Sequence, residues 1–247
     1  NIKKFSKFKS KIIYLVNDTE PKNIIYDKNF KEPSDQMRPN AMKRIANQRE
    51  FLLKGLESAD DNDLILYSDN DEIPNPETLN ENLLKEKISI FEQKLFYYKF
   101  NLLYDKLLWY GTRACRKKHL PKFEILRLIK PKKYPLFRID TFFKKNKRMD
   151  VQIIKNGGWH FTNIKSPKEI HFKLSNFLHH LEYEYSGLSE KDIEKMIDNR
   201  LIYYDHDADK SEKKWKASLN LEKVDDVELP SYIVKNKELF KKWFDLK

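Results

Sequence analysis

Glycine is scarce in this sequence, which contains only five. The phosphate-binding loops of P-loop NTPases and of dinucleotide-binding folds need closely spaced glycines before a helix. The sequence contains no G-x-x-x-x-G-K-[ST], no G-x-G-x-x-G and no G-x-S-x-G pattern, which excludes these loops and the nucleophile elbow of α/β-hydrolases. A phosphorylated ligand would have to be bound by other groups.

Cysteine and long apolar runs are also nearly absent. Cys115 is the only cysteine, so an internal disulfide and a multi-cysteine zinc site are excluded, in agreement with a reducing compartment. No apolar run reaches the roughly 18 residues of a membrane span. The run "IIYLV" follows basic residues but is too short for a signal peptide, and we interpret it as a strand. We expect a cytoplasmic protein, or one peripheral at a membrane surface.

Two familiar metal-binding patterns fail in detail. "DHDAD" at 205–209 resembles the start of a calcium loop, but Lys210 and Lys216 occupy the positions that need Gly and Glu. His179-His180 lacks the H-E-x-x-H spacing of a zinc protease. We interpret the first pattern as a solvated acidic loop.

The net charge of +11 allows two interpretations. The lysines are scattered through amphipathic segments, often beside acidic residues, which is typical of a solvated surface. A basic face could instead meet phosphate, an acidic glycan, a membrane surface or nucleic acid. The densest clusters are Arg116–His119, Lys130–Lys133 and Lys144–Arg148.

The order of apolar patterns indicates an α/β chain. Residues 11–17 predict a short buried strand, 18–37 a loop, and 40–57 a helix with Ile45, Leu52, Leu53 and Leu56 at helical spacing. "LILYS" predicts a second strand, parallel to the first. The later segments predict a helix at 77–87, strands at 88–104 and within 134–161, a capped helix from Ser166, and helices at 189–200 and 231–244. We expect a single domain, 1–247.

Three acidic residues follow the second predicted strand, in "DLILYSDNDEIPNP". In an extended segment Asp69 and Asp71 would point to one side, beyond the carboxyl end of a strand, where open α/β sheets bind ligands. Mg²⁺ and Mn²⁺ bind carboxylates together with substrate phosphates. Ile73-Pro74 should end the strand. The alternative is an acidic turn in which Asp69 caps the next segment.

At this point the sequence resembles glycosyltransferase family 17, which includes the beta-1,4-mannosyl-glycoprotein N-acetylglucosaminyltransferase of the bisecting GlcNAc. "DDNDLILYSDNDEIPNPETL" is similar to the metal-binding segment of that family. Further similar segments follow in the family's order and span nearly the whole chain: "KFKSKIIYLVND", "NAMKRIANQREFLLKGL", "GGWHFTNI", "HHLEYEY" and "LPSYIVKNKELFKKWF".

The resemblance implies a fold, a reaction and a set of ligands. The fold would be a GT-A-like mixed sheet flanked by helices, with a helical carboxyl-terminal part. The reaction would be a metal-dependent, inverting transfer of N-acetylglucosamine or a related sugar from UDP-GlcNAc to a glycan or glycolipid, with Mn²⁺ or Mg²⁺ as cofactor. Family members carry an earlier strand–helix–strand unit, and we expect this sequence to lack it.

The metal and donor residues are predicted from the same segments. Asp71 is the first candidate for metal coordination, Asp69 for the metal or the ribose, and His160 for the metal or the diphosphate, while Glu72 would be structural. Gly157-Gly158 would allow close approach of a ligand. The donor candidates are Arg44, Gln48, Arg49, Asp69 and Trp159, followed by Arg113 and Arg127.

The residue that would deprotonate the acceptor hydroxyl stays open. Glu182, Glu184 and His180 lie in the "HHLEYEY" segment, where His180 and Glu184 would share a helix face and Glu182 matches the family's spacing. Two other functions compete with the enzyme. One is a catalytically inactive glycan-binding domain, and the other is a basic nucleic-acid-binding module, which would need "LFYYKFNLLY" to be exposed rather than core. We expect the protein not to bind nucleic acid, and we expect a peripheral contact with a membrane.

Overall fold

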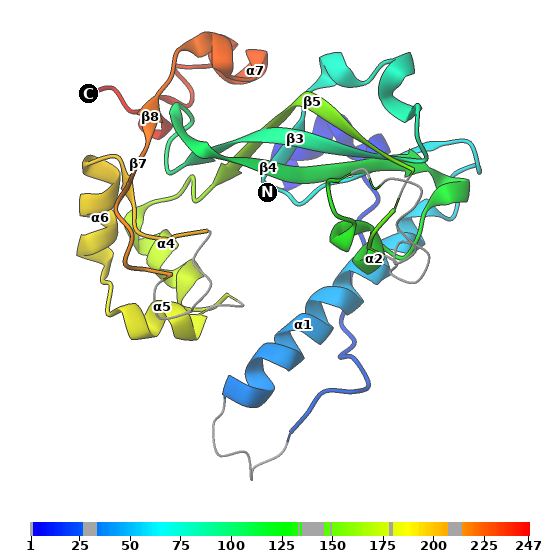
Figure 1. Ribbon diagram of the computed structural model, residues 1–247, viewed down its shortest axis with the longest axis horizontal. Helices are drawn as coiled ribbons and strands as arrows, with labels where there is room; N and C mark the ends of the chain where they lie inside the picture. The colour runs from blue at the N-terminus through cyan, green and yellow to red at the C-terminus, as the bar shows by residue number, and fades with distance from the viewer. Residues whose placement is uncertain are drawn as a thin grey trace.

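A mixed β-sheet with helices on either side forms the centre of the protein (Figure 1). The computed structural model describes residues 2–26, 34–132, 134, 146–148, 150–177, 180–206 and 214–247. Within them, the five main strands lie in the order β1-β4-β3-β5-β2, and β8 (Glu222–Lys223) pairs with β4. Their bounds are β1 Leu64–Tyr67, β2 Glu72–Pro74, β3 Ile88–Tyr97, β4 Leu102–Arg116 and β5 Val151–Thr162. The predicted α/β class and mixed sheet are confirmed.

The sheet centre is buried on both faces. β3 lies between β4, to which it is antiparallel, and β5, to which it is parallel. Helices cover both faces, so nine of the ten residues of β3 are buried, among them the polar Ser89, Glu92 and Gln93. Phe96, Tyr97, Tyr98 and Leu102 are buried, which confirms that "LFYYKFNLLY" belongs to the core.

The predicted strand at 11–17 and its parallel pairing are wrong. Ile2–Lys11 form a 3₁₀ helix, η1, and residues 12–20 have no regular structure. β1 pairs antiparallel with β4. Ile13 and Tyr14 are 63% and 84% exposed, and no strand among the described residues pairs with this segment. Apolar patterning alone does not make a strand without a partner.

The predicted helix at 40–57 is present and longer than expected. It comprises α1 (Ser34–Phe51) and the 3₁₀ turn η2 (Leu52–Leu56), and α1 runs away from the sheet in Figure 1. Leu52 and Leu53, which lie at helical spacing in the sequence, are exposed. α1 and η2 therefore lie beside the core, and their polar side chains are distributed around the helix axis.

The other predicted helices differ from the structure mainly in length. The segment 77–87 forms two 3₁₀ turns, η3 (Pro76–Thr78) and η4 (Glu81–Leu84), so the predicted helix there is wrong. Leu79 ends η3 with φ −83° and ψ 64°, outside the helical region. The helix from Ser166 begins as predicted, with both hydrogen bonds of the capping box.

That capped helix ends earlier than the sequence pattern suggests. α4 spans Pro167–Leu174, and a separate α5 spans His180–Ser186. The apolar residues of the capped segment lie at helical spacing and predict a buried stripe; Ile170 and Leu174 are buried, whereas Leu178 lies outside the described part. α6 (Glu190–Asp198) is confirmed, and the carboxyl-terminal helix is reduced to α7 (Ser231–Lys235) and the turn η8 (Lys241–Trp243). β6 (Leu201–Ile202) and β7 (Leu219–Asn220) form a second small sheet. The short helix α2 spans Phe123–Leu128. The predictions for 135–145 and 207–213 lie outside the described residues.

No helix in the described ranges combines the length and the apolar composition that crossing a bilayer requires.

Cys115 provides a direct probe of the core. Its side chain is fully buried in β4, and burial raises the pKa of the thiol to about 11. At pH 8 only about one thiol in a thousand is then ionised, against about one in four at the unperturbed pKa. We expect iodoacetamide to alkylate the native protein at least about 100-fold more slowly than the urea-unfolded protein. Equal rates would show that β4 is not packed as described.

Candidate functional site

The acidic segment and the Gly-Trp-His block lie side by side. β2 pairs antiparallel with β5, and the register places Glu72 opposite His160 and Pro74 opposite Gly158. The Phe161 N–H donates to Asp71 O at 2.9 Å and extends the ladder by one bond. Two segments far apart in the sequence therefore form one edge of the sheet. Ile73-Pro74, predicted to end a strand, is itself part of β2.

The paired glycines allow this close approach of two backbones. Gly158 has φ +134°, and a Cβ there would lie 2.1 Å from Ile73 O and 2.8 Å from Asn75 N. A Cβ on Gly157 would lie 2.8 Å from Ile154 O. Glycine is required because there is no space for a side chain. The close approach predicted for a ligand is made instead by β2.

Replacing Gly158 by alanine should separate the two segments. The added methyl group meets the β2 backbone, and the backbone conformation disfavours any L-residue, so we expect a loss of about 2–4 kcal/mol in the free energy of unfolding. Gly55→Ala is the matched control, because its Cβ would meet only Leu15 Cδ1, at 3.5 Å. Urea unfolding of both variants measures the difference. Equal stability of Gly158→Ala and the parent would contradict the close β2–β5 contact.

Asp71 and His160 form a polar pair at this edge. His160 Nε2 lies 3.4 Å from Asp71 Oδ2, and the Asp71 side chain is 32% exposed. Burial favours the neutral form of Asp71, but the hydrogen bond from His160 and the charges of His160 and Lys173 outweigh it, so the pKa of Asp71 is lowered. Burial also lowers the pKa of Lys173. An ionised carboxylate accessible to solvent thus lies between two basic side chains.

The imidazole of His160 is fixed by an aromatic neighbour. Trp109 of β4 stacks on it, with ring centroids 4.4 Å apart and an interplanar angle of 27°. His160 is 7% exposed, and its Nδ1 has no hydrogen-bond partner among the described residues. Stacking therefore orients the ring so that Nε2 faces Asp71.

Asp69 and Asp71 do not point to one side, as predicted for an extended segment. Residues 69–72 form a turn closed by the Glu72 N–H, which donates to Asp69 O at 3.0 Å. Asp favours the first position of such turns. The Asp69 carboxylate lies 3.1 Å from Arg127 Nη2 and 3.8 Å from Arg49 Nη2. The sequence left an acidic turn open as the alternative. In this turn Asp69 pairs with Arg127 and Arg49, whereas Asp71 faces His160.

Glu72 has the structural role that the sequence suggested. Its side chain is fully buried; Oε1 accepts from Trp109 Nε1 and from Arg127 Nη2, each at 2.7 Å. Burial alone would lower the pKa of Arg127, but Glu72 and Asp69 raise it. A Cβ on Gly111 would lie 2.7 Å from the Glu72 carboxyl carbon, so the missing side chain of Gly111 leaves room for this network.

A second buried arginine adds positive charge nearby. Arg113 of β4 is 4% exposed and donates to the carbonyl oxygens of Tyr110 and Gly111. Burial and the charge of Arg127 lower the pKa of Arg113 to about 10, although Glu72 and Asp69 oppose the shift. Three arginines, Arg49, Arg113 and Arg127, thus gather around two carboxylates, Asp69 and Glu72, a balance suited to an anionic ligand.

The geometry of Asp71 and His160 fits a divalent cation that also binds its substrate. Two neighbouring ligands of an octahedral ion at about 2.1 Å lie about 3 Å apart, close to the 3.4 Å between Oδ2 and Nε2. The described residues contain no group of three or more His, Cys, Asp or Glu side chains that could hold an ion. The remaining ligands would have to be phosphate oxygens and water. Asp69, held by two arginines, is less available than Asp71.

The predicted donor residues are only partly brought together. Arg49 reaches Asp69, whereas Arg44 pairs with Glu20 in an ion pair. Arg44 and Gln48 line an open depression of about 450 Å³, with Asn17–Pro21, Asn47 and Phe51 among its other residues. Trp159 points to the other face of β5, where its Nε1 donates to Glu228 O at 2.7 Å. Trp159 therefore lies away from Asp71 and His160, because neighbouring residues of a strand face opposite sides.

The three candidates for the acceptor base lie on α5. Glu184 is exposed. The Glu182 side chain is 14% exposed and lies 3.9 Å from Arg38 Nη1. His180 Nδ1 lies 2.9 Å from Phe177 O. α5 packs on α4 through Tyr183 Oη, 2.7 Å from His171 Nδ1, and α4 carries Lys173 beside Asp71. α4 therefore lies between the three candidates and the acidic edge.

No family model, curated protein or solved structure matches this chain. A function has to be argued from the residues of the chain and their geometry.

Sequence patterns missed several members of the site. Trp109, Lys173 and Gly111 belong to it only because β4 and α4 pack beside β2 and β5. Arg127 was a candidate for contact with a diphosphate, and it holds two carboxylates in place. A scarce glycine between Tyr110 and Thr112 was the one available signal, since glycine inside a strand often marks close approach.

Proposed function

We propose that this chain is a metal-dependent glycosyltransferase with a GT-A-like fold. It would transfer N-acetylglucosamine or a related sugar from a nucleotide sugar to a glycan or glycolipid acceptor, with inversion at the sugar carbon. The observation that carries the proposal is the 3.4 Å approach of Asp71 and His160, which come from two segments that the family resemblance singles out independently. Chance would rarely place both at one edge with a solvent-accessible carboxylate.

The cation and the cationic side chains would share the charge of the diphosphate. Asp71 and His160 would hold Mn²⁺ or Mg²⁺, which supplies Lewis-acid stabilisation of the leaving nucleoside diphosphate when bound. Lys173, beside Asp71, and Arg49, 27% exposed, are placed to contact phosphate oxygens. Arg127 and Glu72 would keep the acidic turn in position rather than contact the donor.

The nucleoside would lie along α1. Arg49 faces Asp69, and its sequence neighbour Gln48 lines the depression that also contains Asn47 and Phe51. Amide side chains match the donor and acceptor edge of a uracil ring, and an aromatic side chain offers a stacking face. This supports a uridine nucleotide as the donor.

Glu182 is the proposed base for the acceptor hydroxyl. Inversion by single displacement needs a carboxylate on the face of the sugar opposite the leaving group. Glu182 is partly buried beside Arg38, whereas Glu184 is directed to solvent. Glu182→Gln should lower kcat at least about 100-fold with little change in donor KM, which assays of transfer to an acceptor would measure. A proportional rise in donor KM instead would assign Glu182 to donor binding.

The competing functions make different predictions. Burial of Phe96, Tyr97 and Tyr98 removes the stacking surface that the nucleic-acid reading needs. An inactive glycan-binding domain would bind glycans but would not hydrolyse UDP-GlcNAc. Slow Mn²⁺-dependent release of UDP from UDP-GlcNAc, absent with EDTA, supports the enzyme, and glycan binding without any UDP release or transfer would favour the inactive domain.

A further inference from the structure

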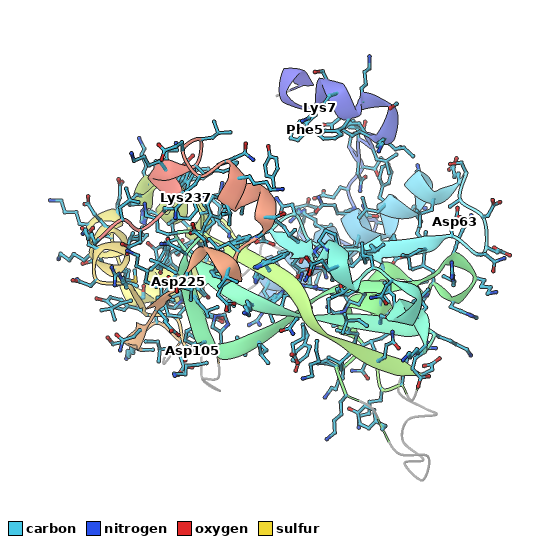
Figure 2. All side chains as sticks on the ribbon, turned by 90° about the horizontal axis from the view of Figure 1, so that it is seen from above. Phe5, Lys7, Asp63, Asp105, Asp225 and Lys237 are labelled. Carbon is cyan, nitrogen blue, oxygen red and sulfur yellow. The ribbon has the colours of Figure 1, made fainter. Side chains whose placement is uncertain are left out.

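An apolar segment near the start of the chain stands apart from the rest of the molecule. Figure 2 shows η1, marked by Phe5 and Lys7, extending beyond the sheet and its helices. The exposed fractions are 55% for Phe5, 63% for Ile13 and 84% for Tyr14. We call this the amino-terminal apolar segment; its exposed apolar members are Phe5, Phe8, Ile12, Ile13, Tyr14 and Val16.

The helix geometry places the two aromatic side chains of η1 on one edge and most of its lysines on the others. A 3₁₀ helix has three residues per turn, so residues three apart lie on one edge. Phe5 and Phe8 therefore share an edge of η1, Lys7 and Lys9 lie on the other two edges, and Lys11 ends the helix on the aromatic edge. An amphipathic element with aromatic residues on one side and lysines on the others is typical of a helix lying in a lipid–water interface.

The charge of the segment identifies its partner. Residues 1–17 contain five lysines and no acidic residue, and Asp18 is the first acid in the chain. We propose that the amino-terminal apolar segment docks on an anionic lipid surface. The exposed apolar members of the segment enter the interface, and Lys7, Lys9 and Lys11 contact the headgroups. This inference is independent of the glycosyltransferase proposal.

Two other occupants fit the segment less well. Nucleic acid would match the lysines and could stack on Phe5, Phe8 and Tyr14, but it would leave the aliphatic side chains of Ile12, Ile13 and Val16 in water. A second copy of the chain would bring two sets of lysines together with no acidic side chain in the segment to neutralise them. An anionic bilayer satisfies both the charge and the aliphatic surface.

Vesicle cosedimentation tests the inference with the full chain. The probes are phosphatidylcholine vesicles with and without phosphatidylserine. We expect binding to the anionic vesicles that falls with added salt, and at least about tenfold weaker binding to pure phosphatidylcholine. Phe5→Ser with Phe8→Ser, and separately Lys7→Glu, Lys9→Glu and Lys11→Glu together, should each lower the partition coefficient at least about tenfold.

A charge-matched variant serves as the control. Lys191→Glu, Lys216→Glu and Lys235→Glu together change the net charge by the same amount at exposed positions elsewhere and should leave most of the binding intact. Equal loss in both triple variants would overturn the proposal in favour of general attraction by net charge. Absence of vesicle binding would also overturn it. So would vesicle binding that persists in the Phe5 and Phe8 variant when the same changes abolish oligonucleotide binding or self-association.

Discussion

Asp71→Asn should abolish Mn²⁺-dependent binding of UDP-GlcNAc while leaving the fold intact. The side chain keeps its size and its contact with His160, but loses the charge that a divalent cation requires. Changes to residues behind metal ligands cost about 10–100-fold in metal affinity, so removal of the ligand charge itself should cost about 100-fold or more. Calorimetric titration with UDP-GlcNAc, with and without Mn²⁺, measures this loss.

Two further variants make the result specific. His160→Ala should weaken Mn²⁺-dependent binding without abolishing it, since imidazole is the second of two protein ligands. Asp226→Asn removes a carboxylate paired with Lys237 at 2.7 Å in the carboxyl-terminal part and should leave binding unchanged. If Asp71→Asn and His160→Ala both bind the donor as the parent does, the metal assignment is wrong.

Glu72→Ala should be the most destabilising single change at this edge of the sheet. It leaves the Arg127 guanidinium partly buried beside the Asp69 carboxylate alone, and leaves Trp109 Nε1 without its acceptor. Removal of one partner from a buried ion pair typically costs about 3–5 kcal/mol. In a chain of this length that corresponds to a fall of roughly 10 °C in Tm. Thermal and urea unfolding measure both quantities.

Two further variants show whether the loss of stability comes from the buried Glu72–Arg127 pair or from loss of any carboxylate. Glu238→Ala changes a side chain that is 88% exposed and should alter stability by less than about 0.5 kcal/mol. Arg127→Met combined with Glu72→Ala should be more stable than Glu72→Ala alone, because the uncompensated guanidinium is then removed. A Glu72→Ala cost below about 1 kcal/mol would contradict the buried network.

The sequence predicted the strands of the sheet centre better than their partners. Apolar and aromatic residues predicted β3 and the first three residues of β4, and they placed a strand within 134–161, where β5 lies, but residues 105–116 of β4 were not predicted. The same signal failed at residues 12–16, where an equally apolar run has no neighbouring strand to pair with. Pairing depends on distant segments, so neither the antiparallel β1–β4 pair nor the β2–β5 pair could be read locally.

The candidate site was predicted residue by residue but not as an arrangement. Asp71 and His160 were both proposed as metal ligands, and the structure brings them together. The expectation that Asp69 and Asp71 would act as a pair failed, because a turn gives Asp69 to Arg127 and Arg49 instead. Trp159 and His160 were expected to serve the same site, yet strand alternation places them on opposite faces. Trp109 could not have been predicted, since only packing of β4 beside β5 brings it onto His160.

Crystals soaked with UDP and Mn²⁺ test the central claim most directly, because anomalous diffraction locates the ion without assumptions about activity. The account predicts one anomalous peak bonded to Asp71 Oδ2 and His160 Nε2, with diphosphate oxygens completing the ion's coordination. Bound UDP with the ion elsewhere, or with no ion between these two side chains, would contradict it.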